Sequence, residues 1–220
     1  MAIGQGTIID TSQVTGTDGN TYNIPLGRQT DQLVSELHGK YYNWAYRGKV
    51  FIGSTPIAGV AIPISSTTAP TPCLRNPLGS GVNLVLIRYT AAYTGGTGAV
   101  TGFGYYALTN AGGTIGTAAP VSAFAATTPT NALIGFGAAS RAKFSGTGTV
   151  TLTTAGTLVR PMALGQAVAA ATNANLPQPG IQDDFDGTVI IPPGVLFYPA
   201  GTAASGDTFA QSLIWYEAPI

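Results

Sequence analysis

The sequence predicts an all-β protein made of short antiparallel strands. From Lys49 onward, runs of β-branched and aromatic residues follow one another, and Gly, Pro, Asn or Thr separates most of them. Several short strands divided by turn residues are typical of a β-sandwich or a barrel. Only one earlier segment has a clear helical periodicity. We therefore expect an antiparallel β-sandwich preceded by an N-terminal extended arm and one short helix.

The predicted strands differ in how strongly their composition marks them. Val82–Tyr89 is almost continuously apolar, which indicates a strand buried in the centre of a sheet. Leu213–Glu217 is expected to be a core strand. Pro192–Gly194 is expected to be a turn, because proline lacks the amide hydrogen that a sheet ladder needs. The runs with strand composition are Val50–Ile52, Gly59–Ile62, Val82–Thr90, Gly102–Leu108, Ala132–Phe136, Thr147–Thr153, Thr188–Ile191, Gly194–Tyr198 and Ser212–Tyr216.

The segment before the first strand divides into an arm and a helix. Glycines interrupt residues 1–29, and Asp18-Gly19-Asn20 is a turn signal, so an extended arm is expected there. A helix is predicted over 30–47, with Thr30 or Asp31 as its cap. Its apolar stripe consists of Leu33, Val34, Leu37, Tyr41 and Trp44. The resulting domains are 1–47, the arm and helix, and 48–220, the β-sandwich.

Two low-complexity segments interrupt the predicted sandwich. Residues 109–131 consist largely of Gly, Ala, Thr and Pro and are predicted to form a long loop. Residues 163–175 are rich in alanine, which favours a short helix, although a loop packed against a neighbour fits as well.

The charge content favours association of the chain with copies of itself. Charged residues make up 8% of the sequence, against roughly 25% in an ordinary soluble domain, and nine basic residues balance nine acidic ones. A surface with so little charge has little electrostatic repulsion between copies. Clusters of Lys and Arg, which nucleic-acid binding requires, are absent from the sequence, so we expect no nucleic-acid partner. No apolar run reaches about 18 residues, so we expect no membrane partner.

The sequence offers few residues for catalysis or metal binding. His38 and Cys73 are its only histidine and its only cysteine, too few for a zinc site. A Cys–His nucleophile pair would have to use both of them. We interpret Cys73 as a small buried hydrophobic residue and His38 as a surface or subunit-contact residue. The chain is therefore expected not to be an enzyme, and to have no catalytic, cofactor-binding or metal site.

The sharpest polar cluster is Asp183-Asp184-Phe185-Asp186-Gly187. Three carboxylates followed by glycine are able to bind Ca²⁺ through oxygen, but a solvated turn before a strand has the same composition. An EF-hand-like loop counted from Asp183 would need glutamate at its twelfth position, which is Gly194. The other acidic residues carry no glycosidase motif. They are Asp10, Asp18, Asp31, Glu36, Asp207 and Glu217.

Two further motifs allow a binding role and a structural role. Thr94-Gly95-Gly96-Thr97-Gly98 is rich in glycine, but no Lys-Ser/Thr follows it, so a hairpin loop is favoured over a phosphate-binding loop. An aromatic cluster is suited either to stacking on a sugar or base, or to packing at a subunit contact, where Tyr and Trp are enriched. Its members are Tyr41, Tyr42, Trp44 and Tyr46.

Three segments together resemble uncharacterised structural proteins encoded by tailed bacteriophages. They are 36–42 (Glu-Leu-His-Gly-Lys-Tyr-Tyr), 76–84 (Asn-Pro-Leu-Gly-Ser-Gly-Val-Asn-Leu) and the ending from Pro192-Pro193-Gly194 to Trp215-Tyr216-Glu217-Ala218-Pro219. The resemblance implies a jelly-roll-like sandwich in a virion. The role that it implies is capsid decoration, a head fibre or a tail-associated component. It assigns no catalytic residue.

These observations lead to one expected function and two alternatives. The expected function is a structural virion protein that forms a homo-oligomer, most simply a trimer, and contacts other virion proteins. Carbohydrate binding or host attachment on the same fold is the first alternative, and a subunit of an extracellular filament is the second. An aromatic groove with nearby Asp or Asn would favour carbohydrate binding, whereas flat apolar faces would favour assembly.

Overall fold

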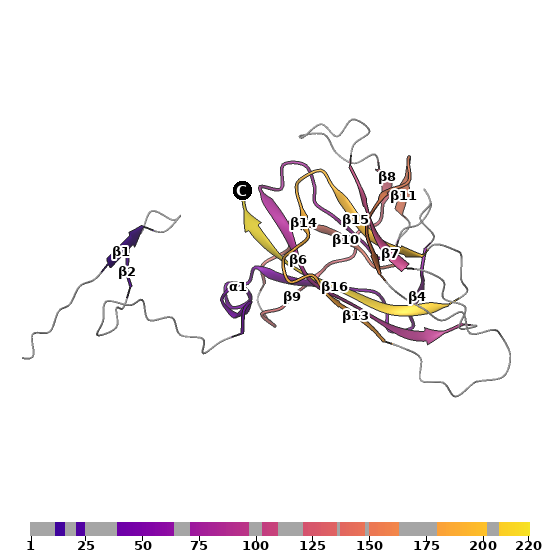
Figure 1. Cartoon of the computed structure of the whole chain (residues 1–220), viewed down its shortest axis with the longest axis horizontal. Coiled ribbons are helices and arrows are strands. Elements are labelled where there is room, and N and C mark those ends of the chain that lie inside the picture. The colour runs from indigo at the N-terminus through magenta and orange to yellow at the C-terminus, as the bar shows by residue number, and fades with distance from the viewer. Residues whose placement is uncertain are drawn as a thin grey trace, which may run out of the picture. The chain divides into compact units, whose positions relative to one another are not determined.

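The computed structural model describes most of the chain in two units. The described residues are 12–15, 21–24, 39–63, 71–96, 103–109, 121–135, 137–147, 150–162, 180–201 and 207–220. The first unit, Met1–Asn43, contains the antiparallel pair β1 (Ser12–Thr15) and β2 (Thr21–Ile24). The second unit, Trp44–Ile220, contains the sheets shown in Figure 1.

Two antiparallel sheets form the body of the second unit. We call them the β16 sheet and the β15 sheet after their central strands. The β16 sheet has the order β13 (Ile181–Asp184), β6 (Val82–Gly95), β16 (Thr208–Pro219), β3 (Val50–Ser54), β9 (Thr130–Asn131), with β14 (Ile190–Ile191) beside β6 and β4 (Val60–Ala61) beside β16. The β15 sheet has the order β10 (Lys143–Ser145), β5 (Cys73–Arg75), β15 (Leu196–Gly201), β7 (Phe103–Leu108), β12 (Thr157–Met162).

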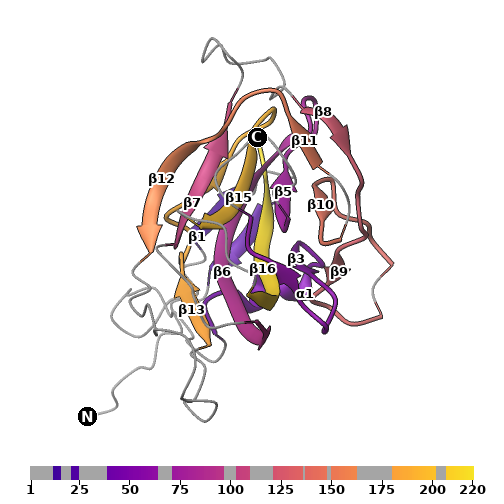
Figure 2. The same ribbon diagram turned by 90° about the vertical axis from the view of Figure 1, so that its right-hand side faces the viewer.

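The strand pairing is that of a jelly roll. β3 pairs with β16, β5 with β15, β6 with β13 and β14, and β7 with β12. The first strand of the sandwich therefore pairs with the last, the second with the next to last, and so on inward. A long hairpin paired in this way and rolled up gives two facing sheets, as Figure 2 shows. The predicted antiparallel β-sandwich is confirmed.

An aromatic layer fills the space between the two sheets. Trp215 on β16 is fully buried, and its ring stacks at 6.3 Å on Phe51 and at 6.2 Å on Phe144. Tyr105 stacks on Phe197 at 5.5 Å and meets the edge of Tyr89 at 5.6 Å. These rings come from both sheets, so their burial holds the sandwich together. Aromatic pairs of this kind contribute about 0.5–1.5 kcal/mol each beyond the area they bury.

A second, smaller core covers the outer face of the β15 sheet. Alternate residues of β15 point to opposite faces, so Phe197 enters the main core while Leu196 and Tyr198 enter the second. The antiparallel pair of β8 (Val121–Phe124) and β11 (Val150–Leu152) supplies the covering side chains Val150 and Leu152. Every residue of β15 is consequently buried.

The helix α1 (Tyr42–Tyr46) lies beside the β16 sheet. The ring of Trp44 stacks on Tyr216 of β16 with centroids 5.0 Å apart. Gly48 follows the helix with φ of 67°, a left-handed conformation that glycine adopts readily at a helix end, and its amide donates to the Ala45 carbonyl.

Most of the predicted strands are present, with shifted ends. β6 is the continuously apolar strand and has partners on both sides, and β16 is the predicted core strand at the end of the chain. Pro192–Gly194 is a turn as predicted, and it connects β14 in one sheet to β15 in the other. Of the predicted helix over 30–47, the described part is helical only in α1, and residues 30–38 lie outside the described ranges. The alanine-rich segment 163–175 also lies outside them.

Two sequence predictions were wrong. Residues 109–131 are not simply a loop, because they contain β8 and β9. Ala132–Phe136 is not a strand over its described part, 132–135. The side chain of Asn131 accepts a hydrogen bond from the Leu133 amide at 2.9 Å, and Gly135 has φ of 86°. This local turn ends the sheet pairing at β9. Strands β5, β10, β12 and β13 were missed, since they are short or lack β-branched runs.

The close approach of the sheets at Gly53 generates a stability prediction. A Cβ atom at Gly53 would lie 2.5 Å from the ring of Phe144, which is 1% exposed. We expect Gly53→Ala to lower the free energy of unfolding by about 1–3 kcal/mol, because the buried ring has to move. Urea unfolding, monitored by circular dichroism, measures this change in the free energy of unfolding.

Gly137→Ala is the matched control, because no atom lies within 4 Å of a Cβ placed there. We expect it to change stability by less than about 1 kcal/mol. Equal effects of the two substitutions would contradict the packing described between β3 and β10.

Candidate functional site

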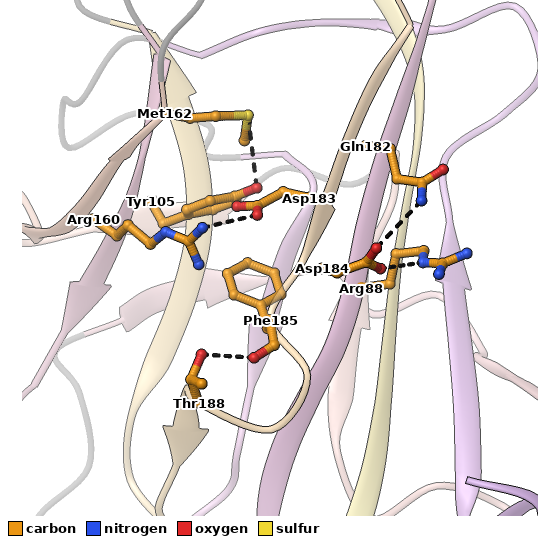
Figure 3. Close-up of polar contacts among 9 residues, drawn as sticks. All are labelled: Arg88, Tyr105, Arg160, Met162, Gln182, Asp183, Asp184, Phe185 and Thr188. Carbon is orange, nitrogen blue, oxygen red and sulfur yellow. Dashed lines mark hydrogen bonds and ion pairs between the residues drawn. The ribbon is translucent and has the colours of Figure 1, made fainter. Parts of the chain in front are cut away.

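The acidic cluster begins on β13, where strand geometry separates its first two carboxylates. Side chains of successive residues in a strand point to opposite faces. Figure 3 shows Asp183 and Asp184 on opposite sides of β13. Asp183 faces the gap between the two sheets, and Asp184 faces the outer side of the β16 sheet. The two carboxylates therefore have different partners.

Asp183 joins the two sheets through an ion pair. Nη2 of Arg160, on β12 of the β15 sheet, donates to Oδ1 of Asp183 at 2.9 Å. The side chain of Asp183 is 13% exposed, whereas that of Arg160 is 44% exposed. The Arg160 guanidinium also lies over the ring of Phe185, 5.7 Å from its centroid. This cation–π contact and the ion pair hold β12 to β13 at one edge of the sandwich (Figure 3).

The hydroxyl of Tyr105 lies in the same polar seam. Tyr105 is on β7 and is fully buried, and its hydroxyl donates to Sδ of Met162 at 3.9 Å. Burial raises the pKa of this hydroxyl, and the negative charge of Asp183 raises it further. The phenol therefore stays protonated and acts as a hydrogen-bond donor. We call Tyr105, Arg160, Met162 and Asp183 the inter-sheet seam.

Asp184 has partners within its own sheet. Nε of Arg88, on the neighbouring strand β6, donates to Oδ1 of Asp184. Nε2 of Gln182 lies 3.4 Å from Oδ2 of the same carboxylate. Both members of the Arg88–Asp184 pair are about half exposed, so water screens their attraction.

The remainder of the cluster is a turn fixed to β6. The amides of Phe185 and Asp186 both donate to the Ile87 carbonyl, at 2.9 and 3.0 Å. Asp186 and Gly187 have φ of 50° and 84°, a left-handed pair that Asp and Gly adopt more easily than other residues. Oγ1 of Thr188 closes the turn by donating to the Phe185 carbonyl at 2.6 Å.

This geometry favours a structural turn over a calcium site. The carboxylates of Asp183 and Asp184 diverge, and each is neutralised by a separate arginine. Within the ranges that the structure describes, no group of three or more His, Cys, Asp or Glu residues is arranged to hold a metal ion. The seam can link two sheets, and the carboxylates of Asp183 and Asp184 do not converge on a common ligand.

The residues considered for nucleophilic chemistry are only partly described. Cys73, on β5, is fully buried, and burial raises the pKa of its thiol far above the ordinary value, so the reactive thiolate is disfavoured. Its place in the second core agrees with the predicted role as a small hydrophobic residue. His38 lies outside the described residues.

Glu217 has a structural partner set that the sequence did not indicate. Its Oε1 accepts hydrogen bonds from Ser140 Oγ at 2.7 Å and from the amides of Arg141 and Ala142 at 2.7 and 3.3 Å. Glu217 is 4% exposed, and its carboxylate fixes the segment before β10 to β16. Asp207 is also buried, at the start of β16. The acidic residues outside the described ranges are Asp10, Asp18, Asp31 and Glu36.

The aromatic residues around α1 differ in their exposure and in their contacts. Trp44 stacks on the sheet, whereas Tyr42 is 43% and Tyr46 is 68% exposed. Nζ of Lys40 lies over the ring of Tyr41, 5.4 Å from the ring centroid. Of the glycine-rich segment, Thr94 and Gly95 end β6, and Thr97 and Gly98 lie outside the described residues.

The outer face of the β16 sheet is a nearly uncharged surface. Three rows of side chains cross β3, β16, β6 and either β13 or β14, and the only Lys, Arg, Asp or Glu residues in them are Arg88 and Asp184, which pair with each other. The first row is polar, the second is mixed and the third is apolar. The rows are Ser54, Ser212, Thr90 and Gln182; Ile52, Ile214, Arg88 and Asp184; and Val50, Tyr216, Val85 and Ile190.

A groove of about 500 Å³ lies on this face beside the polar row. None of its described lining residues is charged or aromatic. The groove borders Ile57, in the turn after β3, whose side chain is 90% exposed. The lining residues are Ser54, Thr55, Ile57, Thr90, Ala91, Ala92, Gly180, Ile181, Gln182, Ala210, Gln211 and Ser212.

Comparison with known proteins gives no relative. The chain matches no protein-family model, no curated protein and no solved structure. Among the described residues, no helix has the length and apolar character needed to cross a membrane.

The unequal burial of the two arginine–aspartate pairs generates a stability prediction. We expect Arg160→Met to lower the free energy of unfolding by about 1–2 kcal/mol, because it leaves the mostly buried Asp183 carboxylate without its cation. Arg88→Met is the matched control and should lower the free energy of unfolding by less than about 1 kcal/mol. Chemical denaturation of both variants measures the difference, and a larger loss in the control would contradict the role of the seam.

The divergence of the carboxylates also predicts the response to calcium. Millimolar CaCl₂ or a chelator should leave the melting temperature within about 1 °C, because a ligand shifts stability only if the native state binds it. Differential scanning fluorimetry with MgCl₂ as the ionic-strength control measures this. A rise of several degrees that is specific to Ca²⁺ and is lost in Asp183→Asn would show that the cluster binds the ion.

Proposed function

We propose that the protein is a non-enzymatic structural component of a virion that assembles with copies of itself. Its place would be on the capsid or tail surface, as a decoration protein or a minor structural component. The observation that carries the proposal is the nearly uncharged outer face of the β16 sheet, where the charges of Arg88 and Asp184 pair with each other. A broad neutral face with half-buried Ile52 and Ile214 lacks the charge that keeps monomeric proteins apart.

The jelly-roll pairing supports the proposal at the level of architecture. Viral capsid proteins use this double-sheet fold, and so do lectins and cupins, so the fold by itself does not select a function. The choice among these classes rests on the surface residues.

The groove favours assembly over carbohydrate binding. Small-molecule sites commonly combine aromatic side chains with a few convergent polar groups. The described lining of this groove has Ser, Thr, Ala, Gly, Ile and Gln but no aromatic side chain and no carboxylate. Such a lining suits contact with another protein surface.

The proposed partners are further copies of the chain and other virion proteins. Three copies is the expected number, and residues 1–29 are expected to reach onto a neighbouring copy. Nine basic and nine acidic residues give the chain no excess positive charge for a nucleic acid or an anionic membrane.

Native mass measurement tests self-assembly. Sedimentation velocity at micromolar concentration should give a multiple of the 22.3 kDa chain mass, because the neutral face is expected to be covered by another copy. A folded monomer under these conditions would overturn the proposal. Detection of the chain's peptides in purified virus particles, by mass spectrometry, tests the virion assignment separately.

A further inference from the structure

Two positively charged side chains lie directly opposite each other on the outer face of the β15 sheet. Lys143 of β10 is the register partner of Arg75 of β5. Leu74 and Phe144, their neighbours along the chain, are in the main core, so Arg75 and Lys143 face outward. Side chains paired in this way have Cβ atoms about 4.5–5.5 Å apart, and like charges at such positions destabilise a sheet. A negative charge bound between them would offset this repulsion.

The described residues supply no carboxylate to this pair. Within the described ranges, the recorded ion pairs are those of Arg88 and Arg160, and none includes Arg75 or Lys143. The carboxylate of Glu217, which lies near the start of β10, is buried and accepts hydrogen bonds from the backbone there. The counter-charge therefore has to come from outside this part of the chain.

Arg75 is partly removed from water. Its Nε is buried and has no hydrogen-bond partner, and the next residue in its row across the sheet, Leu196, is fully buried. A cation beside an apolar core is less well solvated than an exposed one, so it attracts an anion more strongly. The donors of a guanidinium also match the paired oxygens of a carboxylate, a phosphate or a sulfate.

We propose that Arg75 and Lys143 form a binding site for an oxyanion. Arg75 supplies planar, partly desolvated donors, and Lys143, which is exposed on the edge strand β10, supplies a second positive charge. The same chemistry accepts a carboxylate of a second copy of the chain or a free inorganic oxyanion.

The distribution of charge along the chain allows a second copy to supply the carboxylate. Met1–Asn43 has four acidic and two basic residues, whereas Trp44–Ile220 has five acidic and seven basic residues. The chain as a whole is neutral, but the unit that contains the site has an excess of positive charge. The carboxylate source rests on the proposed self-assembly, whereas a free oxyanion as the source is independent of it.

Sulfate at about 10 mM, compared with chloride at the same ionic strength, tests the site and distinguishes the two sources. If the site is open in the protein, sulfate should raise the melting temperature by about 2–4 °C, because the native state binds it. If a carboxylate of a second copy occupies the site, sulfate should compete with it and weaken association at least about tenfold in sedimentation equilibrium.

Two variants remove the site in different ways. Lys143→Glu gives Arg75 a carboxylate within its own sheet, and Arg75→Met removes the guanidinium while keeping an apolar stem. Both should abolish the effect of sulfate. Arg47→Glu is the matched control, since it makes the same change of charge as Lys143→Glu at an exposed residue after α1, and it should respond to sulfate like the wild type.

Circular dichroism should show all variants folded, and Lys143→Glu decides alone if Arg75→Met does not fold. General stabilisation by sulfate acts on every variant alike, so only the difference between variants counts. The absence of both sulfate effects in the wild type, or equal effects in the wild type and in Lys143→Glu, overturns the site while self-assembly stands. A monomeric wild type whose melting temperature rises with sulfate overturns self-assembly and leaves the site.

Discussion

The central position of β16 is the constraint on which the rest of the structure depends. This last strand pairs with β6 along its whole length and with β3 on its other side, so it unites the beginning, middle and end of the sandwich. Its inward residues Leu213 and Trp215 are fully buried, and Trp215 stacks on rings from both sheets. Glu217, near its end, fixes the segment that leads to β10. Backbone hydrogen bonding and the burial of aromatic rings thus both hold this one strand in the centre of the sandwich.

Strand alternation decides what the acidic cluster does. In sequence, Asp183 and Asp184 are adjacent carboxylates that suggest a shared cation. In the fold, β13 directs one toward Arg160 of the opposite sheet and the other toward Arg88 of its own sheet. The first pair lies in the inter-sheet seam with Tyr105, where loss of the cation is costly. The second is solvated and serves mainly to neutralise the outer face.

The contrast between the two outer faces connects the fold to the proposed function. The insertion between β7 and β12 covers the outer face of the β15 sheet with β8 and β11. It also adds β9 to the edge of the β16 sheet and β10 to the edge of the β15 sheet. The β16 sheet has a neutral outer face, a groove without charges, and Ile57 at its rim.

The sequence by itself determined the all-β class, the buried strands within 82–90 and 212–216, the turn at Pro192–Gly194 and the buried role of Cys73. These features follow from local composition, because apolar runs, proline and glycine act on their own segment. Only the tertiary structure decided the jelly-roll pairing, the Arg160–Asp183 link and the partners of Glu217. Each of these joins residues far apart in the chain, and which distant strands pair is set by packing the aromatic layer between two sheets. Short strands such as β8 and β13 likewise have weak local signals, since their neighbours in the fold, and not their own composition, hold them extended.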